Sequence, residues 1–191
     1  MGLFGPNIPK LMDKKDIGGL VKALKHPKFM IRAHAAYALG EIGAPETAEP
    51  LIQAMYDNRL EVRYEAARSL GMLKSALAVD ALIENLGYGY YVNPDLWVVT
   101  DVNENVVNLN IGDTYNKFRD NVKWALIEIG EPSVGPMMRE LRNRSPYIRA
   151  SAAQVLGCLK SKAALDAIRP LLNDSRSFVR EAASWAVGNI S

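Results

Sequence analysis

The residues best suited to chemistry in this chain are arginines that return at nearly constant spacing. Successive copies lie 31, 56, 30 and 31 residues apart, and an aspartate stands six residues before three of them. A guanidinium can bind a phosphate or a carboxylate through two parallel hydrogen bonds, so an anion site is one interpretation. We favour a structural ladder, because a half-buried arginine needs a partner and an aspartate before a helix can both cap that helix and accept the arginine. The ladder consists of Arg32, Arg63, Arg119, Arg149 and Arg180, with Asp57, Asp113 and Asp174.

A second row of side chains, five residues after each arginine, is suited to binding. It is rich in tyrosine, tryptophan and arginine, the residue types that dominate protein interfaces, where truncation can cost ~2 kcal/mol or more. At 100° per residue this row lies opposite the apolar side of its helix. Packing is the alternative, since Trp185 belongs to the final repeat and Trp124 follows an insertion. The predicted partner-binding residues are Tyr37, Arg68, Trp124, Gln154 and Trp185, with His34, Glu65 and Met72 beside them.

The sequence contains few residues that could form a catalytic or metal site. The chain has two histidines and one cysteine, which is poor material for a metal site. The stretch "GYGYY" at residues 87–91 lacks the third glycine and the helix start of a phosphate-binding loop. We therefore expect no catalytic residue, no metal and no cofactor.

The elements that position these rows are repeated pairs of helices. Self-similarity at a period of about 31 residues predicts a stack of helical hairpins. The second helix of each pair contains the repeated phrase, as in "IRAHAAYALGEIG" from Ile31. The predicted fold is an all-α solenoid, a single domain over residues 1–191, with an N-terminal cap at 1–13 and repeats at approximately 14–44, 45–75, 76–131, 132–162 and 163–191.

The third repeat carries an insertion of 25 residues at 88–112. Its β-branched runs on either side of a polar "NEN" indicate a β-hairpin, with a plain long loop as the alternative. The insertion is rich in aromatic residues and could bind a sugar, a base or a peptide, or pack over the adjacent helices. Its candidate binding residues are Tyr90, Tyr91 and Trp97.

Small residues recur four and eight positions after the arginine. Ala36 and its equivalents let neighbouring helices approach closely, and a glycine follows in four of the five copies. The third repeat has Lys123 and Ile127 in these two places. Because Lys123 replaces a small residue, we expect looser packing beside the insertion.

The composition argues against nucleic acid and membranes as partners. The net charge is +2 with 49% hydrophobic residues, a balance that gives no support to nucleic-acid binding. One cysteine, no signal peptide and no apolar run of membrane-spanning length predict a cytoplasmic protein with no membrane association. The C-terminal end has Leu171, Leu172, Val179 and Val187, an apolar surface that is a candidate for self-association.

The repeated phrases "IRAHAAYALGEIG", "VRYEAARSLGMLK", "IRASAAQVLGCLK" and "VREAASWAVGNIS" resemble the HEAT-like repeat of the phycocyanobilin (PBS) lyase type. The resemblance covers most of the chain and implies a right-handed α-α superhelix whose second helices line a concave face. Deoxyhypusine hydroxylase is similar in repeat style but needs His-Glu pairs for iron, and this chain has no His-Glu dipeptide. Bilin lyase subunits have no short defining motif, and the insertion is a departure from their pattern.

Together these features predict a non-catalytic interaction module, or scaffold, that binds an unidentified protein on the concave face. The alternative is a subunit of a bilin-lyase-like or other enzyme complex.

Overall fold

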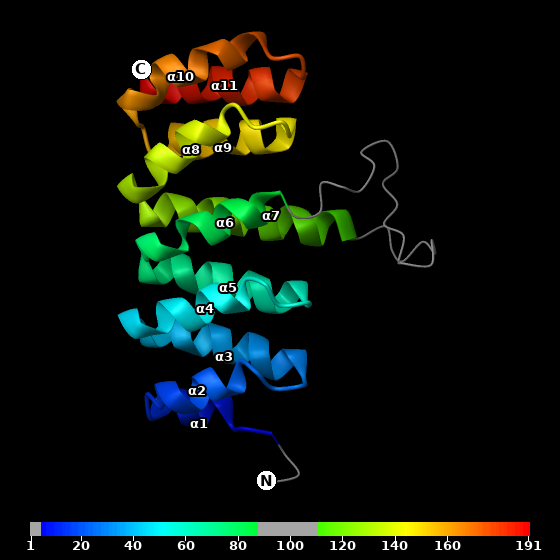
Figure 1. Cartoon of the computed structure of the whole chain (residues 1–191), viewed down its shortest axis with the longest axis vertical. Coiled ribbons are helices and arrows are strands. Elements are labelled where there is room, and N and C mark those ends of the chain that lie inside the picture. The colour runs from blue at the N-terminus through cyan, green and yellow to red at the C-terminus, as the bar shows by residue number, and fades with distance from the viewer. Residues whose placement is uncertain (1–4, 88–110) are drawn as a thin grey trace.

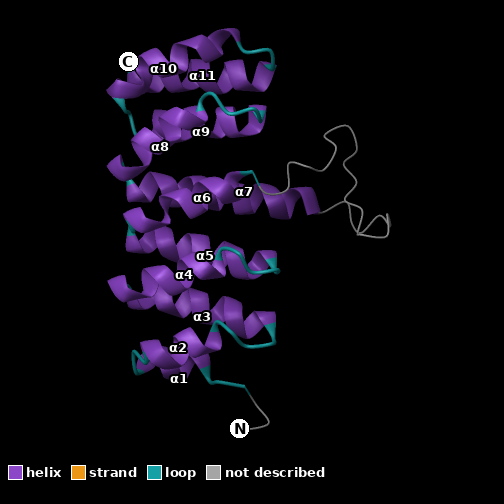
Figure 2. Cartoon of the chain, viewed as in Figure 1, coloured by secondary structure: helices purple, strands orange, loops and turns teal. Residues whose placement is uncertain are grey.

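The computed structural model describes residues 5–87 and 111–191, and every regular element in these two ranges is helical (Figures 1 and 2). The α-helices form a single column of stacked hairpins, as the repeat pattern predicts. The predicted all-α solenoid is therefore confirmed. The α-helices are α1 (Ile8–Asp13), α2 (Ile17–Ala23), α3 (Phe29–Ile42), α4 (Ala48–Ala54), α5 (Leu60–Leu73), α6 (Val79–Leu86), α7 (Ile111–Ile129), α8 (Val134–Glu140), α9 (Pro146–Cys158), α10 (Leu165–Ile168) and α11 (Ser177–Ile190).

Each hairpin pairs a short first helix with a longer second helix: α2 with α3, α4 with α5, α6 with α7, α8 with α9, and α10 with α11. The second helices also pack on one another and form one continuous layer, while α1 packs against α2 and α3 at the N-terminal end. The β-hairpin interpretation of the insertion, together with Tyr90, Tyr91 and Trp97, lies outside the described residues.

Local sequence explains where the helices begin and end. The side chains of Asn7 and Asp16 accept hydrogen bonds from the backbone N–H groups three residues later and so cap α1 and α2. The first helix of the fifth repeat is short: α10 ends at Ile168 and a 3-10 turn, η5 (Arg169–Asn173), follows. Pro170 accounts for this, because proline lacks the N–H that an α-helix interior requires.

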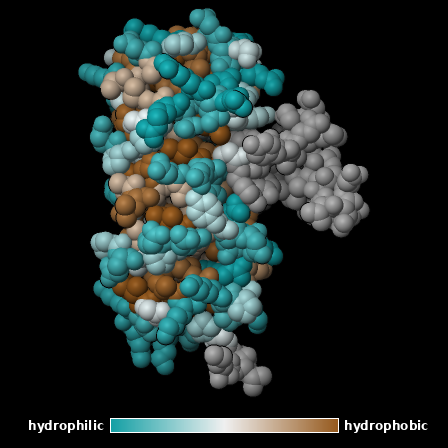
Figure 3. Space-filling view, in the orientation of Figure 1, coloured by the Kyte–Doolittle hydropathy of each residue, from teal (hydrophilic) through white to brown (hydrophobic). Residues whose placement is uncertain are grey.

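The core lies between the two layers of helices, where the helical period predicts it. Leu20 and the leucine, methionine or isoleucine at the same place in each later repeat are completely buried, and so are Ala35 and Leu39 of α3. In Figure 3, bands of hydrophobic surface alternate with hydrophilic ones along the column. Among the described residues, none of the helices combines the length and the apolar character needed to cross a lipid bilayer.

Candidate partner-binding groove

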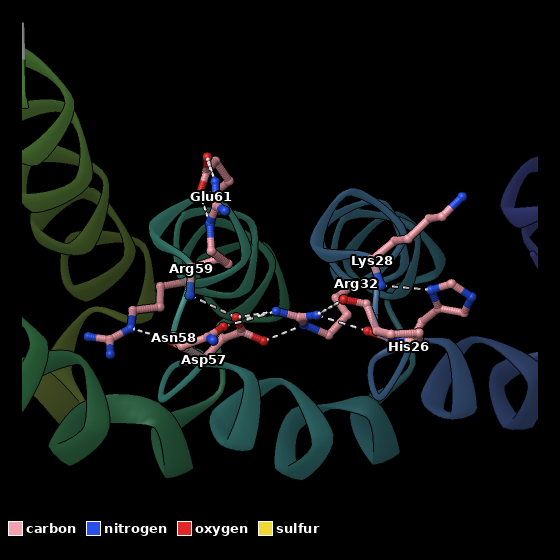
Figure 4. A network of polar contacts seen from close by, with 9 residues as sticks. His26, Lys28, Arg32, Asp57, Asn58, Arg59 and Glu61 are labelled. Atoms are coloured by element: carbon pink, nitrogen blue, oxygen red, sulfur yellow. Dashed lines mark hydrogen bonds and ion pairs between the residues drawn. The ribbon is translucent and has the colours of Figure 1, made fainter.

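The arginine ladder joins each repeat to the next. Arg32 binds Asp57 through two hydrogen bonds, 2.6 Å from Nε to Oδ2 and 2.8 Å from Nη2 to Oδ1 (Figure 4). Its Nη1 donates to the carbonyl oxygen of His26, in the turn of its own repeat, at 2.8 Å. The sequence places Asp57 six residues before Arg63, yet Arg63 donates to the backbone oxygen of Asp57, and the carboxylate receives the arginine of the preceding repeat.

The same arrangement returns 117 residues later. Arg149 binds Asp174 at 2.8 and 2.9 Å and the carbonyl oxygen of Asn143 at 2.9 Å. Arg180 donates to the carbonyl oxygen of Asp174 at 2.8 Å. Arg119 donates to the side chain of Asn116. The side chain of Asp113 lies outside the described residues.

Burial and hydrogen bonding act in opposite directions on the two ladder carboxylates. Burial raises the pKa of Asp57, but the hydrogen bonds from Arg32 and from the Arg59 N–H, with the charges of Arg32 and Arg63, outweigh it and leave that pKa below its usual value. The hydrogen bonds from Arg149 lower the pKa of Asp174 against the smaller effect of burial. Both carboxylates therefore stabilise the fold in their charged form.

We predict that this contribution to stability is lost in acid. A carboxyl group whose pKa is lowered by folding contributes in full above its unfolded-state pKa of about 3.9, and loses that contribution as the pH falls through its lower folded-state value. The free energy of unfolding, measured with urea between about pH 2 and pH 5, should fall less steeply with acid in Asp57→Asn than in the unchanged chain. Equal slopes in the two proteins would show that the charge of Asp57 does not stabilise the fold.

A docking stripe on each second helix sets how closely the next repeat approaches. We define it as the ladder arginine with the residues four and eight positions later, which share one side of the helix. The glycine decides the closest contact: a Cβ at Gly71 would lie 2.8 Å from the Cα of Ala125, and one at Gly157 would lie 2.9 Å from the Cα of Ala186. Only glycine leaves room for a backbone at that distance.

The docking stripe is interrupted on α7. Lys123 and Ile127 take the places of the small residue and the glycine. The turn before α9 has Asn143 where the turns before α5 and α11 have Asp57 and Asp174. As a result α7 and α9 contact each other far less than do α3 and α5, α5 and α7, or α9 and α11. The looser packing expected from Lys123 is confirmed.

A groove of about 480 Å³ opens at this interruption. Its sides are formed by Trp124 on α7 and Trp185 on α11, which keep 38% and 47% of their surface exposed. The Lys123 Nζ crosses between the helices, 2.9 Å from the Gln154 Oε1 and 2.9 Å from the Asp120 Oδ1. The lining residues are Asp120, Lys123, Trp124, Ile127, Gln154, Val155, Cys158 and Trp185.

Both tryptophans reach over the preceding second helix. A Cβ at Gly71 or at Gly157 would lie 2.7 Å from the Cζ3 of Trp124 or Trp185, so each indole edge rests on a glycine of the repeat before it. The rings are thus held in place at one edge while much of their surface faces solvent. The packing role considered from the sequence and an exposed binding surface coexist in the same side chains.

The other predicted binding residues gather on α3 and α5. The guanidinium of Arg68 lies over the ring of Tyr37, 5.1 Å from its centroid, and pairs with Glu65 at 3.8 Å. Burial raises the pKa of Glu65, against the charges of Arg68 and His34. A hydrogen bond with Glu41 raises the pKa of Tyr37.

The row predicted from the sequence therefore falls into two groups: Tyr37 with Arg68, and Trp124 with Gln154 and Trp185. His34 and Met72 are exposed on α3 and α5. Sequence reasoning missed Ile127 and Val155 as groove residues. The signal for Ile127 was present, because a bulky residue in a slot that otherwise holds glycine must push the next helix away.

Comparison with known proteins agrees with this architecture. Residues 17–91 and 136–191 match the family model for HEAT repeats. The chain belongs to the HEAT repeat family. A segment of 61 residues is 39% identical to the phycocyanobilin lyase subunit alpha of Synechococcus elongatus, and covers 32% of this chain and 22% of that protein. The match therefore spans only about a fifth of the relative's length, and it confirms that these HEAT repeats resemble the phycocyanobilin-lyase type.

Two solved structures show the same HEAT fold. The complex of CpcE and CpcF of phycocyanin lyase from Nostoc sp. PCC7120 matches with a TM-score of 0.52 and 22% identity over 95% of this chain and 67% of that chain. The archaeal HEAT-like repeats protein from Thermococcus onnurineus NA1 matches with a TM-score of 0.54 and 14% identity over 96% of this chain and 74% of that one. At these identities the likeness concerns the fold alone.

Proposed function

We propose that this HEAT repeat protein is a non-catalytic interaction module, and that it binds another protein through the groove between α7 and α9. The observation that carries the proposal is the interrupted docking stripe. At this place the chain has a lysine and an isoleucine where other repeats have a small residue and a glycine, and the close contact of two helices is replaced by a groove with exposed aromatic sides.

The exposed surface of the two tryptophans supports a binding role. A tryptophan can bury 150–250 Å² of surface, approximately, and a soluble protein gains stability by covering it. Trp124 and Trp185 are held at one edge and keep 38% and 47% of their surface exposed, so a partner can cover that surface without rearranging the fold. Lys123, Asp120 and Gln154 at the same groove can form hydrogen bonds with a partner's backbone.

The two groups of the row suit an elongated partner. Second helices of a stack are spaced by about 8–10 Å, so a row over five of them extends about 32–40 Å. An extended segment of about ten to twelve residues has this length. In this arrangement the two tryptophans hold apolar side chains, and Arg68 with Tyr37 contacts the other end of the segment.

The proposal is tested by capturing the partner from an extract of the source organism with the unchanged protein and with Trp124→Ala and Trp185→Ala. Each substitution should weaken binding by about 2 kcal/mol, or roughly 30-fold in Kd, as expected of an interface hot spot. Retention of the partner by both variants at the level of the unchanged protein would contradict the proposal.

Tyr56→Ala is the matched control for these variants. Tyr56 is also a largely exposed aromatic residue, but it follows α4 among the first helices and its hydroxyl donates to the Glu84 carboxylate at 2.6 Å. We expect it to leave capture unchanged. A comparable loss of binding in Tyr56→Ala would indicate that the tryptophan variants act through general destabilisation.

A second candidate function is a subunit of a lyase-like or other enzyme complex, and the segment similar to phycocyanobilin lyase subunit alpha favours it. On this proposal the purified protein binds phycocyanobilin, and the absorption spectrum of the pigment changes on mixing. An unchanged spectrum at a protein concentration of about 100 μM, well above a micromolar Kd, would contradict pigment binding and favour the interaction module.

A further inference from the structure

The outer face of α11 carries a docking stripe similar to those inside the stack. Arg180, Ser184 and Gly188 stand at the three positions that Arg149, Ala153 and Gly157 occupy on α9. No described residue covers this face. It is a different surface from the groove and does not depend on the proposed function.

The small residues of this stripe face open space. A Cβ at Gly157 would meet the Cα of Ala186 at 2.9 Å, whereas a Cβ at Gly188 would have nothing within 4 Å. Ala153 is completely buried under α11, whereas Ser184 is exposed. The α11 backbone is therefore shaped for a close helix contact that no described part of the chain makes.

The arginine of the stripe is held in its docking conformation by its own repeat. Arg180 Nη1 donates to the carbonyl oxygen of Asp174 at 2.8 Å, as Arg149 Nη1 donates to the carbonyl oxygen of Asn143 at 2.9 Å. In Arg149 the remaining edge, Nε with Nη2, binds the aspartate of the next repeat. The same edge of Arg180 has no acceptor among the described residues.

We propose that the outer face of α11 binds a helical hairpin of another protein, and that this hairpin carries an aspartate in the turn between its two helices. The aspartate completes the two-bond pair with Arg180, while a helix of the hairpin packs on Ser184 and Gly188. This continues the α9–α11 interface by one repeat, with the charge complementarity that the ladder shows at Arg32 and Arg149.

A second copy of this chain is a poorer occupant. At its N-terminal end α1 packs against α2 and α3, and the first turn has His26 where the ladder needs an aspartate. Two α11 faces placed together would join two arginine-bearing stripes, neither of which contains a carboxylate. A second copy therefore does not supply the aspartate that would pair with Arg180.

The first test appends a second copy of residues 161–191 directly after Ser191, which keeps the 31-residue register. We expect the added hairpin to stack, with a gain in helical circular dichroism and a rise in Tm of about 5 °C or more. Asn in place of the aspartate in the added copy should remove most of that rise. An added hairpin that leaves the Tm unchanged, or a rise that is insensitive to this asparagine, would overturn the proposal.

Gly188→Leu provides the matched control. In the chain of 191 residues the leucine projects into open space and should be tolerated, whereas in the extended chain it blocks the contact and should abolish the rise in Tm. An extended Gly188→Leu protein as stable as its parent would contradict the proposed contact.

The second test identifies the occupant with a photo-crosslinking amino acid at Ser184 in an extract of the source organism. The proposal expects a crosslinked peptide from a helical hairpin of another protein with an aspartate in its turn, and a yield at least roughly tenfold lower with Arg180→Gln, since each tenfold is about 1.4 kcal/mol. A crosslink to a second copy of this chain, a crosslinked peptide without such a turn, or no product would overturn it.

Discussion

Replacing Arg32 with methionine should lower the free energy of unfolding by about 2 to 4 kcal/mol, because it removes the cation from a largely buried ion pair. The side chains of Arg32 and Asp57 are only 12% and 13% exposed. Methionine keeps much of the volume but removes the two hydrogen bonds from Arg32 to the carboxylate, and it leaves two carbonyl oxygens of the preceding turn without this donor. Urea unfolding at neutral pH measures the loss.

Arg169→Met is the control for this substitution. Arg169 pairs with Asp166 at 3.1 Å, but the two side chains are 63% and 91% exposed, so the pair should contribute no more than about 0.5 kcal/mol. The double variant Arg32→Met with Asp57→Asn should recover part of the loss, since the buried charge is then gone. A loss in Arg32→Met no larger than that in Arg169→Met would mean that the ladder does not stabilise the stack.

Gly157→Ala is expected to cost about 2 to 3 kcal/mol, the range for overpacking a close contact. The added methyl group would lie 2.7 Å from the Trp185 ring and 2.9 Å from the Cα of Ala186. The ring can move, but the backbone of α11 cannot yield without separating the last two repeats. Thermal unfolding followed by circular dichroism provides the measurement.

The same substitution at Gly188 should have the opposite sign. A Cβ there meets nothing within 4 Å, so alanine should stabilise the helix by about 0.5 to 1 kcal/mol through its higher helix propensity. Equal effects at Gly157 and Gly188 would show that the glycine slot does not set the distance between repeats.

The sequence was sufficient to predict the hairpins and the core. A fixed period of about 31 residues and an apolar face of period 3.6 both act locally, so helices such as α3 and α5 could be placed to within a few residues. The register of the ladder could not be predicted in the same way. Asp57 lies six residues from Arg63 but 25 from Arg32, and only the rise from one repeat to the next determines which arginine reaches its carboxylate.

The groove was predictable in part. Lys123 was sufficient to predict loose packing, because a lysine cannot replace a small residue between two helices without separating them. The shape of the groove depends on side chains that are far apart in the sequence and come together only in the folded structure. Cys158 and Trp185 come together because the indole reaches back over Gly157, and the spacing of these residues along the chain does not reveal that direction.

The most direct measurement compares the separation of α7 and α9 with that of α3 and α5 by spin labels at equivalent positions, nine residues after each ladder arginine. One protein has labels at Glu128→Cys and the native Cys158, and the other has labels at Glu41→Cys and Met72→Cys with Cys158→Ser. The interrupted docking stripe is proposed to open the groove by separating α7 from α9. The labels at 128 and 158 should therefore be about 3 Å or more farther apart than the labels at 41 and 72, which lie on helices with the close-packed spacing of 8–10 Å. Lys123→Ala with Ile127→Gly should bring the labels at 128 and 158 to the shorter distance. Equal separations in the two proteins, or no change on restoring the stripe, would contradict the origin of the groove and with it the proposed binding site.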